Sequence, residues 1–438
     1  MSRPERSNQM TYFAFFPHTQ LVRGKKGASI HDLFNQKLYW LNEAKTAKAI
    51  TSLAHGESIS AAAASSGLTE KTLQRSINLL QSLRLGTPTP HRTISEGYRP
   101  VLSAAQAKDK AIFLSGGTVT CEITSRCLYD CPWCSPKNPL TTKACSCGVW
   151  SNLAGAFPAE KRIFALERLQ EQGYTHVVIR GGEPMLEENQ LFAILEKAAQ
   201  LEIKSEVHTT GFLINNVSAQ LFHRHNTHLV LMAAADNEND FDAATQRKGS
   251  WKKFHKCIQM LQSNNVSFTL KVPVSIEQPE TPQTLAEWAI ELGATDIDYI
   301  IYAPPNNGYT AADLRHVTAS SAPSDMAVSM QQFFKNAECH SCFNNTCFIS
   351  ADGNLSACIG HRKPIANLRK TAMSKVLHQD LLNLSRTATS RHAMPDCKGC
   401  EFRYGCWACL VRTEQLQGSK EQKHWNCLYD PGQAQWAE

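Results

Sequence analysis

The sequence predicts an α/β fold, in which a middle region of alternating strands and helices is flanked by a small mixed domain and a cysteine-rich domain. The middle region alternates continuous apolar runs, typical of buried parallel strands, with segments of helical periodicity. The first part of the chain has short strands followed by helices. Nine of the sixteen cysteines fall within residues 339–427. A chain of 438 residues is too long for one ordinary core, so we expect several domains.

The expected domains follow changes in composition along the chain. They are a winged-helix domain at 1–87, a linker at 88–111, a partial (β/α)6 barrel of the TIM type at 112–308, a polar bridge at 309–335 and a cysteine-rich domain at 336–438.

The first hundred residues indicate a winged-helix domain. Residues 62–80 look like a helix-turn-helix, with a turn at Gly67 and Thr69 as the N-cap of the second helix. Such a domain could read DNA with Lys71 and Arg75, or hold a peptide as an added strand; we favour the peptide. The predicted strands are 11–16, 20–23, 29–33 and 37–41, and the predicted helices are 43–53, 59–65 and 70–85.

Six strand-helix units in the middle region predict a parallel sheet that curls like three-quarters of a TIM barrel, with its working face at the carboxyl ends of the strands. The predicted strands are 118–124, 176–180, 206–210, 228–234, 267–274 and 297–302. The helices expected between them are 159–172, 190–201, 218–224, 251–262 and 282–292.

Three cysteines, Cys127, Cys131 and Cys134, follow the first of these strands. Three thiolates fill three corners of a four-iron cluster and leave one iron for a small molecule with amino and carboxylate groups, such as S-adenosylmethionine (SAM). The alternative is a zinc knuckle, for which Cys145 and Cys147 could supply further ligands.

The second strand ends in Gly181-Gly182-Glu183-Pro184. Two glycines let a ligand contact the backbone, and Glu183 can accept a hydrogen bond from an ammonium group. A tight strand-to-helix turn is the alternative. The run 208–211 ends the third strand, and 233–236 and 271–273 end later strands, so these segments could line the same cavity.

The C-terminal cysteines have a regular spacing that core packing does not explain. An Asp-Gly pair, Asp352-Gly353, lies between apolar runs and predicts a hairpin there. Structural zinc is the alternative to iron, because Cys-x2-Cys pairs suit both metals. The cysteines are Cys339, Cys342, Cys347, Cys358, Cys397, Cys400, Cys406, Cys409 and Cys427.

These motifs resemble those of a known family. The three-cysteine loop, with Trp133 before its last cysteine, and the Gly-Gly-Glu-Pro turn resemble the radical SAM enzymes. Cys342-x10-Gly353-x4-Cys358 with the cysteines after it resembles the SPASM domain. The N-terminal segment resembles peptide-modifying members, including the grasp-with-SPASM and cyclophane-forming groups, in which a winged-helix RiPP recognition element binds the leader of a precursor peptide.

The resemblance implies SAM and three [4Fe-4S] clusters as cofactors. Cys127, Cys131 and Cys134 would hold the SAM-binding cluster. An outer auxiliary cluster would be held by Cys397, Cys400, Cys406 and Cys427, and an inner one by Cys358 and Cys409 with two of Cys339, Cys342 and Cys347. Two residues separate Cys406 from Cys409 where the family has three. This departure from the family pattern concerns the assignment of Cys409 as a cluster ligand. The residues implied to bind SAM are Trp133, Gly181, Gly182, Glu183, Pro184, Thr209 and Thr210.

Four cysteines remain outside these sets. We expect Cys121 and Cys257 to be buried residues of a strand and a helix, whereas Cys145 and Cys147 either face the substrate or have no role. The run from Asp240 to Trp251 resembles a loop of SPASM-containing members, also without an assigned role.

The activity that the resemblance implies is SAM cleavage to a 5′-deoxyadenosyl radical, which takes a hydrogen from a precursor peptide. The peptide radical then closes onto another side chain, with a carbon-carbon bond favoured and a thioether possible, and an electron donor such as flavodoxin or ferredoxin is expected. One alternative is oxidation of a sulfatase residue to formylglycine. The other is a redox-sensing DNA-binding regulator, which would give the Gly-Gly-Glu-Pro turn no purpose.

Composition sets further expectations. Residues 1–110 carry a net charge of +8, which suits either an anionic partner or a solvated basic surface. The first 20 residues lack signal-peptide architecture and no apolar run is long enough to cross a membrane, so we expect a soluble, cytoplasmic protein with reduced thiols. We expect neither nucleic acid nor membrane as a partner.

Overall fold

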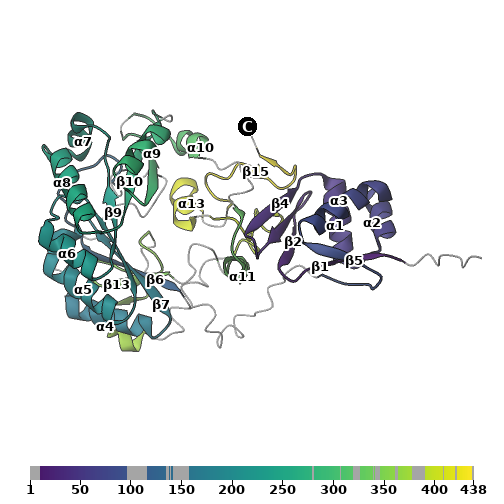
Figure 1. The fold of residues 1–438 in the computed structure, drawn as a ribbon, viewed down its shortest axis with the longest axis horizontal. Coiled ribbons are helices and arrows are strands. Elements are labelled where there is room, and N and C mark those ends of the chain that lie inside the picture. Colours follow the sequence, from purple (N-terminus) through teal and green to yellow (C-terminus); the bar gives the residue numbers. More distant parts are fainter. Residues whose placement is uncertain are drawn as a thin grey trace, which may run out of the picture.

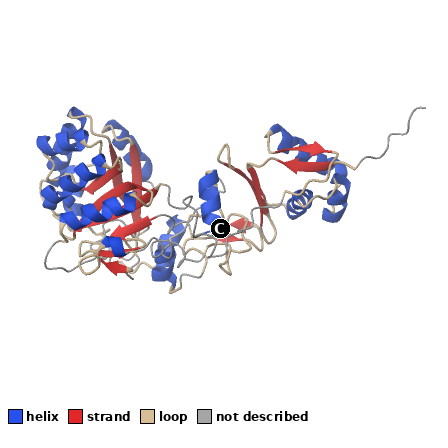
Figure 2. Cartoon of the chain, turned by 90° about the horizontal axis from the view of Figure 1, so that it is seen from below, coloured by secondary structure: helices blue, strands red, loops and turns tan. Residues whose placement is uncertain are grey.

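The computed structural model arranges the chain as three regions (Figure 1). A large sheet with its helices lies at one end, the N-terminal unit lies at the other, and the cysteine-rich part lies between them, as a second view also shows (Figure 2). The structure describes residues 10–95, 116–134, 138, 140–141, 157–278, 281–305, 307–318, 326–338, 340, 346–360, 364–376, 390–407, 409–419 and 422–436.

The N-terminal unit has the strands and helices that the sequence predicts, in the predicted order. Its antiparallel sheet has the order β2-β3-β4, and β1 pairs antiparallel with β5. Strand β5 lies partly in the predicted linker, because its Gly-Thr-Pro-Thr sequence has no apolar alternation. The elements are β1 (Tyr12–Phe15), β2 (Thr19–Arg23), β3 (Ala28–Asp32), β4 (Lys37–Leu41), α1 (Ala44–Ala54), α2 (Ile59–Ser66), α3 (Glu70–Ser82) and β5 (Gly86–Thr89).

The turn between α2 and α3 forms as the sequence predicts. Gly67 ends α2 with a φ of 71°, a left-handed conformation that favours glycine. The Thr69 side chain accepts a hydrogen bond from the Thr72 amide at 3.2 Å and caps α3. Helix α3 buries one apolar face in the core of the unit, formed by Leu73, Ile77 and Leu80.

The large sheet contains the six predicted strands, all parallel and in sequence order. Helices α4, α5, α6 and α8 lie along its outer face (Figure 1). The strands are β6 (Gly117–Thr124), β7 (Tyr174–Gly181), β8 (Lys204–Thr209), β9 (His228–Met232), β10 (Phe268–Ser275) and β11 (Asp296–Tyr302). The helices are α4 (Ala159–Gln170), α5 (Glu188–Gln200), α6 (Asn216–Arg224), α8 (Ser250–Ser263) and α9 (Thr281–Glu291), with a 3-10 turn at Pro184–Glu187.

Three helices lie where the sequence predicted loop. Helix α7 (Glu238–Thr245) occupies the segment after β9, and α10 (Ala311–Thr318) and α11 (Met330–Glu338) lie in or beside the expected bridge. Helix α7 buries only Phe241 and Thr245, so its apolar periodicity is weak. Its start is a side-chain cap, in which Asn237 accepts from the Asp240 amide at 3.0 Å.

The cysteine-rich part extends the large sheet. The predicted hairpin at Asp352-Gly353 is confirmed, and Gly353 has a φ of 84° in its turn. Strand β12 pairs parallel with β6, so the sheet has nine strands in the order β11-β10-β9-β8-β7-β6-β12-β13-β14. The remaining elements are β12 (Thr346–Ile349), β13 (Asn354–Ser356), β14 (Ala366–Asn367), a 3-10 turn (Met373–Lys375), α13 (Leu410–Gln417), β15 (Tyr429–Asp430) and β16 (Gln435–Trp436).

The N-terminal unit packs on the cysteine-rich part through a small apolar cluster. Val22 and Leu33 of the unit contact Phe333, Ala337 and Tyr404. Hydrogen bonds join the same surfaces, including Lys25 N to Gly399 O at 2.8 Å. None of the helices in the described part of the chain has the length and apolar character that a membrane crossing requires.

Candidate active site

A cavity lies at the carboxyl-end side of the central parallel strands, where the sequence predicts the working face. Consecutive strands each contribute to it: β7, β8 and β9 supply residues at or near their ends, β10 supplies Lys271 from its middle, and the loop after β6 supplies the three cysteines. The lining residues are Cys127, Tyr129, Cys131, Cys134, Arg180, Gly181, Gly182, His208, Thr209, Thr210, Val230, Met232 and Lys271.

The loop of residues 127–134, hereafter the cysteine loop, is held from two sides. Within it, the Cys134 amide donates to the Cys131 carbonyl at 3.1 Å. From outside, the end of α7 supports it, because the Asp130 amide donates to Thr245 O at 3.1 Å and the Arg247 guanidinium donates to Leu128 O at 3.3 Å. The segment from Asp240 to Trp251, to which the sequence assigned no role, therefore braces the cysteine loop.

Gly181 and Gly182 are required by the close approach of the chain before the cysteine loop. A Cβ on Gly181 would lie 2.2 Å from Thr124 O, and one on Gly182 would lie 2.1 Å from Arg126 O. The amides of Gly182 and Glu183 donate to these same carbonyls at 3.0 and 2.8 Å. The glycine pair thus joins the end of β7 to the loop after β6, and it also lines the cavity.

The Glu183 carboxylate is fully buried and accepts four hydrogen bonds from the chain itself. One oxygen accepts from Met185 N at 2.9 Å and from Thr209 Oγ1 at 2.7 Å. The other accepts from Thr210 N at 2.8 Å and from the Thr210 hydroxyl. Glu183 therefore holds Thr209 and Thr210, the two threonines at the end of β8, in place. Both threonines line the cavity.

The remaining predicted site residues lie beside the cavity. Among the described residues, Trp133, Glu183 and Pro184 do not line it. Trp133, a residue of the cysteine loop, is buried, with its ring centroid 5.7 Å from that of Tyr302. Pro184 begins the 3-10 turn after β7. Burial and the nearby Glu183 charge raise the pKa of the Tyr129 hydroxyl, so this lining residue stays protonated.

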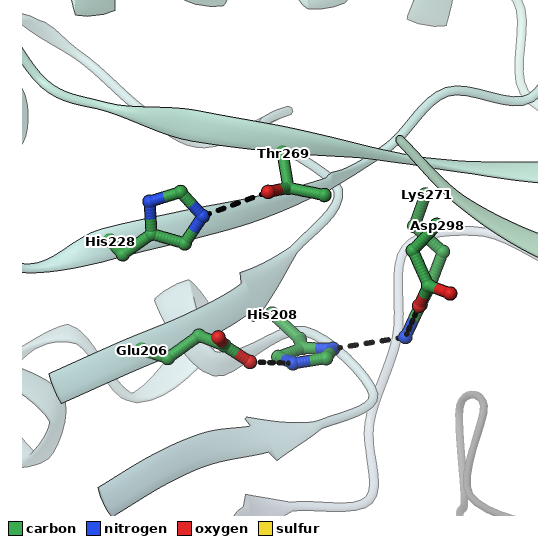
Figure 3. Close-up of polar contacts among 6 residues, drawn as sticks. All are labelled: Glu206, His208, His228, Thr269, Lys271 and Asp298. Atoms are coloured by element: carbon green, nitrogen blue, oxygen red, sulfur yellow. Dashed lines mark hydrogen bonds and ion pairs between the residues drawn. The ribbon is translucent and has the colours of Figure 1, made fainter. Parts of the chain in front are cut away.

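A polar network borders the cavity (Figure 3). His208 Nε2 lies 2.6 Å from Glu206 Oε1, and His208 Nδ1 lies 3.3 Å from Lys271 Nζ. Lys271 Nζ also forms an ion pair with Asp298 Oδ2 at 3.3 Å. Because an ammonium can only donate, Nδ1 must accept and Nε2 must carry the proton that Glu206 accepts.

The protonation states agree with this pattern. Burial, together with the Lys271 charge, lowers the pKa of His208 to about 3, so the ring is neutral near pH 7. Burial raises the pKa of Glu206, but the hydrogen bond from His208 and the Lys271 charge outweigh it and hold the pKa below its usual value. Two buried cations, Lys271 and Arg180, therefore face a cavity that contains three thiols.

The cysteines of the cavity suit an iron-sulfur cluster by their chemistry and number, since one loop brings three thiols to the cavity. Zinc requires all its sulfur ligands about 2.3 Å from one centre. In a cluster each iron takes its own thiolate, so the thiols stand farther apart around a larger body.

A second cysteine group lies in the C-terminal part. Cys427 contributes to the raised pKa of Cys397, of Cys400 and of Cys406, which indicates that the four thiols face a common region. Burial raises the pKa of Cys397 and of Cys406, the latter to about 11. Neutral thiols at such positions are stable only without a metal, because coordination deprotonates them.

The other predicted ligands are placed only in part. Cys358 and Cys409 are partly buried. Cys347 is buried on β12, where the Tyr174 hydroxyl is hydrogen-bonded to its sulfur and burial raises its pKa well above the usual value. As expected, Cys121 and Cys257 are buried in β6 and α8. Cys339, Cys342, Cys145 and Cys147 lie outside the described residues.

Sequence reasoning did not single out Arg180 or Tyr129 as site residues. Arg180 immediately precedes the Gly-Gly pair at the end of β7, and a cation buried at a strand end was the available signal. Tyr129 lies between the first two cysteines, where its burial depends on the fold of the loop. His208 and Lys271 belong to segments that were expected to line the cavity, and both do.

Comparison with known proteins identifies the two chemical domains. Residues 121–289 match the family model of the radical SAM superfamily. Residues 331–401 match the SPASM model, described as an iron-sulfur cluster-binding domain. No curated protein matches the sequence.

Similar folds occur among solved structures. Streptococcus suis SuiB bound to S-adenosylmethionine is 15% identical, covers 95% of this chain and 99% of its own, and has a TM-score of 0.53. SuiB bound to the precursor peptide SuiA covers the same shares, with 14% identity and a TM-score of 0.53. Native anSMEcpe with bound AdoMet is 14% identical, covers 70% of this chain and 93% of its own, and has a TM-score of 0.51.

The domains and the cavity define a radical SAM enzyme. More particularly, the chain is a radical SAM enzyme that carries a SPASM domain, and its cofactors are S-adenosylmethionine and [4Fe-4S] clusters.

Proposed function

We propose that this enzyme matures a ribosomally made precursor peptide by installing a cross-link within it. The observation that carries the proposal is the cavity, in which three cysteines, a glycine pair and two buried cations meet at the carboxyl ends of the sheet. The likeness to SuiB, which binds the precursor peptide SuiA, supports a peptide substrate.

The residues of the cavity suit SAM. In our proposal Cys127, Cys131 and Cys134 hold the cluster whose fourth iron chelates SAM. Arg180 and Lys271 supply positive charge for the SAM carboxylate. Glu183 acts indirectly, because its own oxygens are occupied by Thr209, Thr210 and Met185. When bound, the cluster and SAM supply the 5′-deoxyadenosyl radical that abstracts a hydrogen from the peptide.

Three clusters are proposed in all. The outer auxiliary cluster is assigned to Cys397, Cys400, Cys406 and Cys427, whose mutual electrostatic influence supports a shared site. For the inner cluster we assign Cys358 and Cys409 with Cys339 and Cys342. Cys347 is left out of this set, because its thiol is packed inside the large sheet against Tyr174.

The N-terminal unit, residues 1–87 in our division of the chain, is proposed to be a winged-helix RiPP recognition element that binds the peptide leader. The helix-turn-helix at Gly67 supports this assignment. SuiB aligns with 95% of the chain, whereas anSMEcpe aligns with 70%, a difference that favours a peptide maturase of the SuiB type. The six parallel strands suit a partial barrel, preceded by a linker from residue 88 and followed by a bridge and a SPASM domain from residue 336.

We favour a carbon-carbon bond of the cyclophane type over a thioether. Either bond removes two hydrogen atoms from the peptide: one leaves with the deoxyadenosyl group, and the other leaves as a proton while its electron passes to an auxiliary cluster. The outer cluster would return this electron to a carrier such as flavodoxin or ferredoxin.

The test needs the reconstituted enzyme and a candidate peptide, taken from a short reading frame beside the gene. Anaerobic incubation with SAM and a reductant should lower the peptide mass by two hydrogen atoms, with fragment ions missing between the joined residues. The Cys131→Ala variant is the control and should leave the mass unchanged. A peptide that binds the enzyme but keeps its mass while SAM is cleaved would contradict the proposal.

A further inference from the structure

Arg391 is a buried cation beside the outer cysteine group. Its side chain is 2% exposed. Its Nη1 donates to Cys397 Sγ at 3.6 Å and to Met394 Sδ at 3.4 Å. Its Nε and Nη2 have no hydrogen-bond partner among the residues that the structure describes.

No carboxylate neutralises this guanidinium within the described part of the chain, since none forms an ion pair with it there. Burying an arginine without an anion is strongly unfavourable.

The contact from Nη1 to Cys397 Sγ places this guanidinium directly against a thiol of the outer cysteine group. Four thiolates around iron and sulfide would supply a negative charge to balance the guanidinium. Their sulfur atoms would also accept hydrogen bonds from Nε and Nη2 of Arg391. The orphaned guanidinium is therefore an independent sign that an anionic cluster belongs at this place.

We propose that Arg391 sets the reduction potential of the outer auxiliary cluster. This inference rests on the proposed assignment of that cluster to Cys397, Cys400, Cys406 and Cys427. Reduction adds one electron and hence one negative charge to the cluster. A fixed cation that donates to a ligand sulfur stabilises the reduced form more than the oxidised form, so it raises the potential. Arg391 thereby makes the outer cluster a better electron acceptor.

The test measures potentials, which a merely structural role would not move. The full chain with Cys127, Cys131 and Cys134 all changed to Ala is reconstituted anaerobically, so that only auxiliary clusters remain. Iron is then counted, and the protein is titrated with reductant under electron paramagnetic resonance. We expect about eight iron atoms, because each cluster holds four. In this background Arg391→Met should lower the potential of one cluster and leave the other unchanged.

Two further variants decide the outcome. Arg391→Lys keeps the positive charge but loses the guanidinium's fixed set of N–H donors. The cluster potential in this variant should therefore lie between that of the background protein and that of Arg391→Met. Arg391→Lys also provides the measurement if Arg391→Met fails to retain iron. Arg403→Met is the matched control, since Arg403 lies in the same loop but donates to the carbonyls of Arg23 and Cys400. It should shift the potential less.

Two results would count against the account, and they can be told apart. Unchanged potentials in both Arg391 variants with full iron would overturn the inference. About four iron atoms in the background protein, all of them retained when Cys400 is also changed to Ala, would instead remove the proposed outer cluster.

Discussion

The indole nitrogen of Trp40 donates to the buried carboxylate of Glu401 at 3.2 Å, a contact that joins residues 361 positions apart. Trp40 lies on β4 of the N-terminal unit, and Glu401 directly follows Cys400 of the outer cysteine group. The same carboxylate lies against Gly24 and Gly27, where a Cβ would come within 2.2 Å of its oxygens. Gly24 and Gly27, which separate the first predicted strands, therefore leave room for the Glu401 side chain from the C-terminal part of the chain.

This contact predicts that Gly27→Ala loosens the docking of the N-terminal unit. A methyl group there would displace Glu401 from its hydrogen bonds with Trp40 and Tyr429. Hydrogen bonds to charged groups are each worth about 1.5–3 kcal/mol, so we expect a loss of about 2 kcal/mol in the free energy of unfolding. Thermal melts would measure it. The control is Tyr12→Phe, which removes an exposed hydroxyl and should change the melting midpoint little. A glycine such as Gly249 would not serve as a control, because its φ of 80° would strain any alanine placed there. Equal midpoints for Gly27→Ala and the parent protein would contradict the packing described.

His31 predicts a pH dependence of stability. Its ring is buried, both nitrogens lack a hydrogen-bond partner among the described residues, and burial with the Arg403 charge lowers its pKa to about 3. The unfolded chain binds a proton near pH 6.5, so stability is fully present above that pH and falls as the pH drops toward 3. Between pH 7.5 and 5.5 the loss should be about 1 kcal/mol.

The variant His31→Leu removes the titrating group without orphaning a partner. Urea unfolding at the two pH values should show a difference that is smaller by about 1 kcal/mol than in the parent protein. His208, His340 and His424 also have lowered pKa values, so the residual slope should keep its sign. An undiminished slope in His31→Leu would mean that His31 is not buried as described.

Glu183 predicts a large effect on SAM binding through the threonines that it holds. In Glu183→Gln one carboxylate oxygen becomes an amide nitrogen, which cannot accept from Thr209 or Thr210. We expect SAM to bind at least tenfold more weakly, a change of about 1.4 kcal/mol. Equilibrium binding to the reconstituted enzyme would measure it. Glu187→Gln is the matched control, because Glu187 only pairs with the exposed Arg126 at 2.7 Å, and surface pairs contribute little. Equal affinities for the two variants would argue against the role of Glu183.

Cys347 and Cys358 should respond oppositely to substitution. Cys347→Ala removes a buried thiol from β12 and should leave the iron content at that of the parent protein. Cys358→Ala removes a proposed ligand, and about four iron atoms should be lost with its cluster. Iron and sulfide analysis after anaerobic reconstitution distinguishes the two. Loss of iron in Cys347→Ala would return Cys347 to the inner cluster.

Local patterns in the sequence predicted most of the strands and helices. All six parallel strands and the two helices on either side of Gly67 were predicted, because apolar runs and helix caps are patterns of a few neighbouring residues. The pairing of β12 with β6 and the polar helix α7 could not be predicted in this way. The first depends on residues more than 200 positions apart, and the second buries too few apolar side chains to leave a periodic pattern.

The candidate site shows the same division. The cysteine spacing and the Gly-Gly-Glu-Pro turn are local, and the sequence was sufficient to place both at one cavity edge. The partners of Glu183, and the Arg391 nitrogens that lack a partner among the described residues, emerge only from tertiary packing. The glycine pair was predicted to admit a ligand, whereas the structure shows that it also admits the backbone of Thr124 and Arg126.

The central claim is that the cysteine loop supports radical chemistry on SAM. The most direct measurement is anaerobic: the reconstituted enzyme is analysed for iron and sulfide, then given SAM and a reductant and assayed for 5′-deoxyadenosine, with Cys131→Ala beside it. The account predicts about twelve iron atoms in three clusters and nucleoside formation that Cys131→Ala abolishes. Zinc in place of iron, or no nucleoside from a protein with intact clusters, would contradict it.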